Sequence, residues 1–180
     1  MSETPAEVVA FWRDAGPDRW FEKDEAFDET LRSRFLALHE RAAAGELKEW
    51  ESSVEGTLAL LLLFDQFPRN MFRGTARAFA TDELARAIAA GALLKGFDAQ
   101  VAPELRQFFY LPFEHSEDMA DQERAIALYT AAGDQDGLKW AQTHADIIRR
   151  FGRFPHRNPM LGRTTTPEEQ TFLEQGGFAG

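Results

Sequence analysis

A run of large apolar residues without a polar interruption constrains the fold of this chain more than any other feature. Leucine or phenylalanine stands at position 58 and at every position from 60 to 64, so a helix built from this run is apolar on every side. A helix that is apolar all round is buried all round. We therefore expect a central helix against which the others pack. It should end at Phe67-Pro68, because the residue before a proline is disfavoured in the helical conformation.

Composition narrows the class of protein. The 180 residues suit one domain with a sizeable core, and 44% hydrophobic residues exclude a disordered chain. The absence of cysteine excludes disulfides, thiolate catalysis and cysteine-ligated zinc or iron–sulfur sites. No apolar run approaches ~18 residues, so we expect no membrane span. The start Met-Ser-Glu-Thr-Pro lacks the basic and apolar regions of a signal peptide, so we expect a cytoplasmic protein.

The charged residues indicate what kind of partner to expect. The formal net charge of −10 argues against nucleic acid as a partner. Lysine stands only at positions 23, 48, 95 and 139, and 20 basic residues minus these 4 leaves 16 arginines. Arginine suits planar, bidentate and partly buried ion pairs better than lysine does. In so acidic a chain we expect the arginines to pair with specific carboxylates or to bind anions.

Helix-start signals and apolar periodicity recur along the whole chain. Three capping boxes open helices at Thr4-Pro5-Ala6-Glu7, Ser52-Ser53-Val54-Glu55 and Thr166-Pro167-Glu168-Glu169. Asp24 can cap a further helix, whose apolar stripe is Phe27, Leu31, Phe35, Leu38 and Ala42. Two helices meet at a tight polar turn, 134–137, which predicts an antiparallel hairpin. Since no strand alternation is visible, the sequence predicts one all-α domain over residues 1–180 with about eight helices.

The polar residues at the end of the central helix form the first candidate site. They are Asp65, Gln66, Arg69, Asn70 and Arg73. Phe67-Pro68-Arg69-Asn70 returns later as Phe154-Pro155-His156-Arg157-Asn158, and both copies are followed by arginine, glycine and threonine. One interpretation is helix termination, in which proline stops the helix and arginine complements its dipole. The other is two matched corners that bring arginines to one pocket, since such corners often carry function.

The second candidate site is the segment Glu114-His115-Ser116-Glu117-Asp118. In a structural interpretation Ser116 caps the next helix, and the acidic residues after it favour the positive first turn. In a functional interpretation Glu114, His115 and Asp118 act together, because an N-cap by itself does not require Glu114-His115. If the helix already begins at Phe113, Glu114, Asp118 and Asp121 share one face.

The four histidines give little support for a metal. We expect His39 at the surface and His144 as a hydrogen-bonded core residue, whereas His115 and His156 lie in the polar clusters. The sequence contains no His-Glu-x-x-His motif and no paired Glu-x-x-His motif. It also lacks a Gly-rich phosphate loop and a dinucleotide fingerprint. We therefore predict no metal and no cofactor. If a metal were present, its first candidate ligands would be Glu114, His115, Asp118 and His156.

Several of these motifs together resemble one bacterial family. They are Asp65-Gln-Phe-Pro-Arg-Asn70, Arg73-Gly-Thr75, Ala78-Phe-Ala-Thr-Asp82, Glu114-His-Ser-Glu-Asp118 and Phe151-Gly-Arg-Phe-Pro-His-Arg-Asn158. The chain is similar to the family known only as domain of unknown function 924, from about Phe11 to about Leu173. The resemblance implies a fold like that of tetratricopeptide repeats, with antiparallel helix pairs in a curved array. It implies no catalytic residue, because none is established for the family.

Three functions remain open from the sequence. The first is binding of a small anionic ligand, with arginines on one side and carboxylates and histidine opposite. Its candidate residues are Asp65, Arg69, Asn70, Arg73, Glu114, His115, Asp118, His156, Arg157 and Asn158. The second is a hydrolase in which His115 or His156 is the general base and a carboxylate orients it. The third is an interaction scaffold for a peptide or protein. Internal pairing of the polar clusters beside an open groove would favour the scaffold, and a base with an orienting partner would favour the enzyme.

Overall fold

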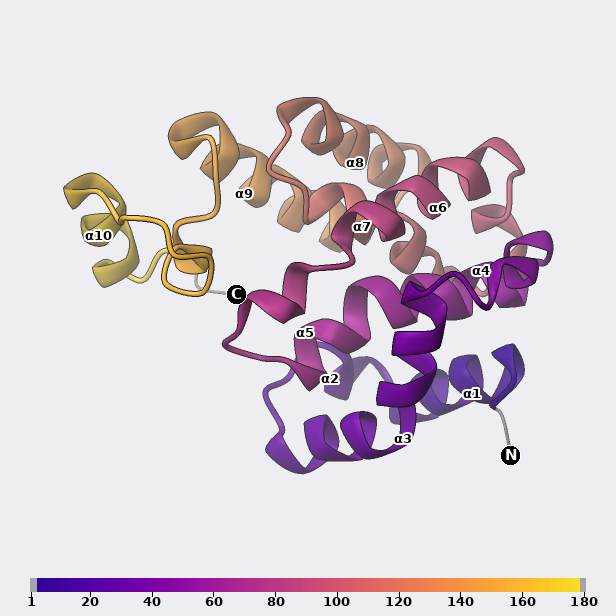
Figure 1. Ribbon diagram of the computed structural model, residues 1–180. Coiled ribbons are helices and arrows are strands. Elements are labelled where there is room, and N and C mark those ends of the chain that lie inside the picture. Colours follow the sequence, from indigo (N-terminus) through magenta and orange to yellow (C-terminus); the bar gives the residue numbers. More distant parts are fainter. Residues whose placement is uncertain (1–2, 179–180) are drawn as a thin grey trace. The chain divides into compact units, whose positions relative to one another are not determined.

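The structure is a computed structural model that describes residues 3–178 (Figure 1). Every regular element within these residues is helical, which confirms the all-α prediction. The α-helices are α1 (Pro5–Ala15), α2 (Pro17–Trp20), α3 (Glu25–Ala43), α4 (Val54–Leu61), α5 (Phe67–Met71), α6 (Asp82–Leu94), α7 (Leu111–Glu114), α8 (Met119–Ala132), α9 (Gln135–Phe151) and α10 (Pro167–Glu174). Short 3₁₀ helices connect them: η1 (Lys48–Ser52), η3 (Ala76–Phe79), η4 (Asp98–Gln100), η5 (Pro103–Phe109) and η6 (Pro155–Arg157).

The chain divides into two compact units. Unit 1 contains residues 3–73 and 77–112, and unit 2 contains residues 74–76 and 113–178. The single domain and the tetratricopeptide-repeat-like array expected from the sequence stay predictions. No helix among residues 3–178 is both long and apolar enough to cross a membrane.

The central helix of unit 1 is buried as its sequence predicts. Every residue from 56 to 68 is buried. α4 packs against α1 and α6, and α3 packs against the elements that follow α4. The predicted stripe of α3 faces this core, since Phe27, Leu31, Phe35, Leu38 and Ala42 are all buried. Trp20 is also in the core, whereas its neighbour Phe21 is 57% exposed.

The predicted helix stop at Phe67-Pro68 is wrong. The chain passes from α4 through a π-helical segment, η2 (Leu62–Gln66), directly into α5, and Phe67 keeps helical dihedrals of −61° and −40°. Proline lacks the N–H that an α-helix needs, and its ring crowds the preceding turn. The wider π turn accommodates it, because the Phe67 N–H bonds five residues back to the Leu62 carbonyl.

Side chains from elsewhere in unit 1 satisfy the carbonyls around this proline. The Thr81 hydroxyl donates to the Phe64 carbonyl at 2.7 Å, and Nδ1 of His39 bonds the Leu63 carbonyl at 2.9 Å. His39 is therefore buried, at 4% exposure, and its predicted surface position is wrong. Burial lowers the pKa of His39, although its hydrogen bond to Leu63 acts against that shift. The helix continues because tertiary contacts supply the hydrogen bonds that Pro68 removes.

Unit 2 is built on the hairpin of α8 and α9, which pack against each other. Gly133 and Gly152, with φ of 71° and 69°, end α8 and α9 in the left-handed conformation. α9 therefore stops at Gly152, two residues before Phe154-Pro155, the predicted stop. Its expected core histidine, His144, is buried at 6% exposure, as predicted.

Two of the three predicted capping boxes are confirmed, at Thr4 and at Thr166. The third is wrong in detail. Ser53 rather than Ser52 caps α4, and its side chain accepts a hydrogen bond from the Gly56 N–H. Because the cap lies one residue later than predicted, position N3 is Gly56, which has no carboxylate to complete the box.

Candidate functional site

The arginine at the end of the central helix lies between two carboxylates. Arg69 forms a bidentate pair with Asp82, at 2.8 and 2.9 Å, and contacts the Asp65 carboxylate at 3.2 Å. Arg69 thus pairs with specific carboxylates, as the sequence predicts for the arginines of this acidic chain. Burial alone would lower the pKa of Arg69, but the charges of Asp65 and Asp82 outweigh it and raise that pKa. Arg69 therefore links Asp65, near the end of the central helix, to Asp82 of α6.

Asn70 and Arg73 converge on a different carboxylate, the buried Asp28 of α3. The Asn70 amide donates to Asp28 at 2.8 Å, and the Arg73 guanidinium contacts both carboxylate oxygens at 2.9 and 3.2 Å. The Asn70 carbonyl oxygen accepts from Gln66 at 3.2 Å. In unit 1 the four predicted site residues therefore connect α3, α5 and α6. The first Phe-Pro corner has a structural role that the sequence interpretation did not include.

A second ion-pair network ties the carboxyl-terminal loop of unit 2 together. Arg163 binds Glu117 bidentately, at 2.7 and 3.0 Å, and also donates to Asn158. Asn158 donates to Glu169 at 3.1 Å, and Arg153 binds both oxygens of Glu169. The hydrogen bonds from Arg153 lower the pKa of Glu169 to about 2. Asn158, a predicted ligand-binding residue, is thus fully buried inside a structural network.

The Glu114–Asp118 segment does not form one helical face. Asp118 is exposed and is the N-cap of α8, where it accepts from the Ala120 N–H at 2.8 Å. The predicted cap, Ser116, lies two residues earlier, and its hydroxyl accepts from the Asp118 N–H. The helix begins at Met119 rather than Phe113. Glu114 is therefore the last residue of α7, whereas Asp118 is the N-cap of α8. His115 is half-buried in the turn between them.

Glu114 instead meets His144, which the sequence interpretation had assigned to the core. Nδ1 of His144 and a Glu114 carboxylate oxygen are 2.5 Å apart, and the two side chains are 7% and 3% exposed. The Phe154 ring links this pair to the second Phe-Pro corner. Its centroid lies 5.5 Å from that of His144 and 5.8 Å from that of His156, and the Arg157 guanidinium lies 4.5 Å over it. We call Glu114, His144, Phe154, His156 and Arg157 the Phe154 cluster.

Three of the predicted site residues therefore belong to the Phe154 cluster: Glu114, His156 and Arg157. Phe178 packs on both histidines of the cluster, at centroid distances of 4.5 Å from His144 and 5.3 Å from His156. The sequence interpretation missed His144, although one signal was available. His144 and Phe151 both project from α9, and the next corner follows directly, so a histidine on that face lies close to Phe154.

Two oxygens beside the Phe154 cluster are buried without a hydrogen-bond partner. They are Oε2 of Glu114 and Oε1 of Gln122. The Gln122 amide nitrogen donates to the carbonyls of Glu114 and Ser116, at 2.6 and 2.7 Å. Because both of these partners are acceptors, the nitrogen must face them and the oxygen must point away. Buried polar atoms without partners are uncommon and call for an explanation.

No three His, Cys, Asp or Glu side chains of residues 3–178 are grouped as a metal ion would require. The prediction that the protein binds no metal stays a prediction, as does the absence of a cofactor.

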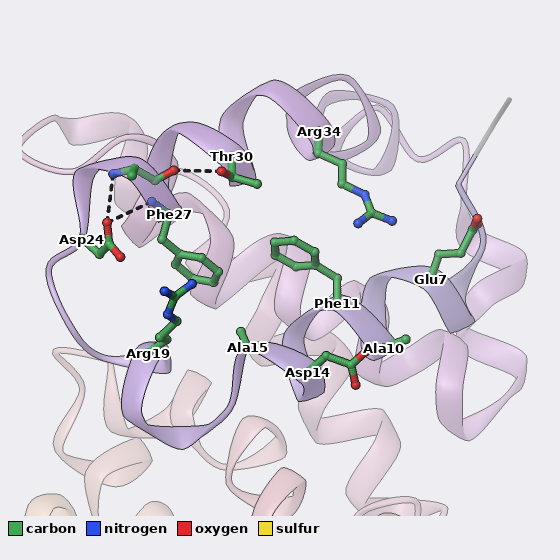
Figure 2. Close-up of a pocket in the computed structure, with 11 residues that line it drawn as sticks. Glu7, Ala10, Phe11, Asp14, Ala15, Arg19, Asp24, Phe27, Thr30 and Arg34 are labelled. Atoms are coloured by element: carbon green, nitrogen blue, oxygen red, sulfur yellow. Dashed lines mark hydrogen bonds between the residues drawn. The ribbon is translucent and has the colours of Figure 1, made fainter.

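An open pocket of about 550 Å³ lies between α1 and α3 of unit 1, and none of the predicted site residues lines it (Figure 2). The rings of Phe11 and Phe27 stack at its centre, with centroids 5.8 Å apart, and Arg19 and Arg34 flank them. Its acidic side chains already have local roles: Glu7 and Asp24 serve in helix caps, and Asp14 contacts Arg13. The pocket is a shallow feature of the fold and shares no residue with the polar clusters.

Comparison with known proteins adds a family but no activity. Residues 8–177 match the family described as "Bacterial protein of unknown function (DUF924)", which confirms the resemblance expected from the motifs. A solved structure, "Structure of Protein of Unknown Function ATU0120 from Agrobacterium tumefaciens", is 53% identical to this chain. The similarity covers 96% of this chain and 97% of that one, with a TM-score of 0.93. No curated protein matches the chain.

Proposed function

Because the chain belongs to the DUF924 family of bacterial proteins of unknown function, we propose a function from its own residues. The protein binds a small anionic ligand at the Phe154 cluster of unit 2. Arg157 and His156 contact the anionic group, beside the pair formed by His144 and Glu114. A tetratricopeptide-repeat-like array of helices would be the scaffold that carries this site.

The observation that carries the proposal is the gathering of three basic side chains around one phenylalanine ring. The Arg157 guanidinium stacks over Phe154, and both histidine rings contact the same residue. A guanidinium held by its face on a ring keeps its N–H groups at the edge, where they match the geometry of a carboxylate or phosphate. Histidine N–H groups add donors of the same kind.

Six of the other predicted residues hold parts of the fold together. Asp65, Arg69, Asn70 and Arg73 bind Asp82, Asp28 and one another. Asp118 caps α8, and Asn158 belongs to the network of Glu169. A ligand that used the arginines of unit 1 would have to break ion pairs with buried carboxylates, which are costly to leave incomplete.

A thermal-shift screen tests the proposal. The probes are phosphate, sulfate, monocarboxylates and dicarboxylates added to the purified protein. A ligand present at 100 times its Kd stabilises the native state by about 2.7 kcal/mol, which corresponds to a rise in Tm of roughly 5–10 °C for a chain of this size. We expect at least one probe to give such a shift.

Matched variants identify the site. Arg157→Ala and His156→Gln should lose the shift, whereas Arg149→Ala should keep it, since Arg149 is an exposed residue of α9 that pairs with Asp146. If Arg157→Ala does not fold, Arg157→Lys and His156→Gln decide. The proposal would be overturned if no probe raised the Tm of the wild type. It would also be overturned if the ligand-induced rise in Tm persisted both in His156→Gln and in an Arg157 variant that folds.

Hydrolysis is a second candidate, favoured by the contact between His144 and Glu114. A carboxylate on Nδ1 fixes the orientation of an imidazole and leaves Nε2 to accept a proton from water, the arrangement of a general base with its orienting partner. The sequence assigned this role to His115 or His156, and the Glu114 contact moves our proposal to His144. We expect His144→Gln to abolish turnover of carboxylic and phosphoric ester probes while retaining binding. If His144→Gln turned over these esters as fast as the wild type, or if the wild type turned over none, His144 would be excluded as a general base.

A further inference from the structure

The two buried oxygens beside the Phe154 cluster restrict what the ligand can be. Oε2 of Glu114 and Oε1 of Gln122 are acceptors, and both side chains are almost fully buried, at 2% and 0% exposure. A buried polar atom without a partner forfeits the hydrogen bonds that it made to water in the unfolded chain. Two such atoms next to one site are a liability unless something supplies donors to them.

Neither oxygen can find a donor by rotating its own side chain. The Gln122 amide is held by two carbonyls, those of Glu114 and Ser116. The Glu114 carboxylate is held by His144 through its other oxygen. The two oxygens cannot bond each other either, because both are acceptors. The missing donors must therefore come from outside these side chains.

The contacts within unit 2 show that the two oxygens without donors lie close to the proposed anion site. Glu114 touches His144, the His144 ring is 5.5 Å from Phe154, and the Arg157 guanidinium is 4.5 Å from that same ring. One end of the cluster thus offers acceptors, with a carboxylate among them, and the other offers an arginine. Aromatic rings between the two ends favour contact with a cation.

We infer that the ligand is a small zwitterion, which carries an ammonium group as well as the anionic group. This inference rests on the function proposed above and narrows it to amino acids and related amines that bear a carboxylate or phosphate. The ammonium donates to Glu114 and Gln122, and its three N–H groups suffice for both oxygens. The anionic group binds Arg157 and His156. A single hydroxyl has one O–H and would satisfy only one of the two acceptors.

Isothermal titration with a matched series tests the inference. The probes are γ-aminobutyrate, butyrate and butylamine, which share one carbon chain and differ in their charged ends, with glycine added to test the spacing. We expect γ-aminobutyrate or glycine to bind at least about tenfold more tightly than butyrate, the factor expected for one charge-assisted hydrogen bond. Butylamine should bind more weakly than the zwitterion, because it has nothing for Arg157.

Two variants assign the effect to the buried acceptors. Glu114→Gln and Gln122→Met should each remove the advantage in affinity of the zwitterion over butyrate. If either variant fails to fold, the wild-type series still decides. Equal affinity for butyrate and both zwitterions would overturn this inference alone, since ordered water would then satisfy the two oxygens. Absence of binding by every probe in the series, together with a negative anion screen, would overturn the proposed function as well.

Discussion

Arg69 is the residue on which the polar end of the central helix depends. It contacts two buried carboxylates, Asp65 through one nitrogen and Asp82 through two. Arg69→Ala should therefore destabilise the protein by about 3–5 kcal/mol, the usual cost of leaving a buried charge uncompensated. Asp65→Ala should cost less, because Arg69 keeps its bidentate partner. Urea denaturation of both variants measures the order. A larger loss in Asp65→Ala would show that the Asp82 pair contributes little.

Glu169 makes stability depend on pH at the acid end. Its pKa is lowered to about 2 from an ordinary value of 4.5, first by the hydrogen bonds from Arg153. A carboxyl with a lowered pKa binds more protons unfolded than folded, so its contribution is complete above pH 4.5 and is lost as pH falls toward 2. The difference in unfolding free energy between wild type and Glu169→Gln should be constant from pH 7 to 5 and shrink from pH 4 to 3. Urea midpoints at each pH measure it, and a constant difference down to pH 3 would contradict the assignment.

His39 also makes the unfolding free energy fall as the pH falls, but at higher pH than Glu169 does. The two contributions must therefore be separated. Its pKa is lowered by burial from 6.5, so its contribution to stability is complete above that value and declines as pH falls below it. Comparing wild type with Glu169→Gln at each pH cancels the contribution of His39 to the unfolding free energy, because both proteins retain His39.

At the scale of elements, the π turn before Pro68 depends on a hydroxyl from α6. Thr81→Val keeps the shape of the side chain but leaves the buried Phe64 carbonyl without its donor, so we expect a loss of about 1–3 kcal/mol. Thr30→Val is the control, because the Thr30 hydroxyl bonds the Ala26 carbonyl on the exposed face of α3. Chemical denaturation should show the control near wild type.

A double-mutant cycle tests whether Pro68 is the reason for the Thr81 hydrogen bond. Pro68→Ala restores an N–H that can bond the Phe64 carbonyl four residues back, as in an ordinary helix. Thr81→Val should therefore cost less in the Pro68→Ala background than in the wild type, by about 0.5 kcal/mol or more. Additive effects would indicate that the hydroxyl and the proline act independently.

At the scale of the whole molecule, the two Phe-Pro corners belong to different units, Arg69 to unit 1 and Arg157 to unit 2. The expectation that both corners bring their arginines to one pocket stays a prediction from the sequence. Like charges brought together need carboxylates or an anion between them. An experimental structure gives the test. Guanidinium groups of Arg69 and Arg157 more than about 20 Å apart, two Debye lengths at ~0.1 M salt, would exclude a shared cavity.

The sequence by itself determined the fold class, the central helix and most helix starts. These depend on neighbours within a turn: the apolar run 60–64, the stripe of α3, and the caps at Thr4, Asp24 and Thr166. Local sterics and backbone hydrogen bonds decide such features, and both can be read from adjacent residues.

The tertiary structure alone decided how the polar residues are used. Pro68 predicts a stop locally, but Thr81 and His39 supply the hydrogen bonds that let the helix continue. His144 reads as a core residue until Glu114, 30 positions away, is seen to bind it. A side-chain hydrogen bond acts over about 3 Å in space and without regard to separation along the chain. The partners of buried polar groups are therefore fixed only when the helices have packed.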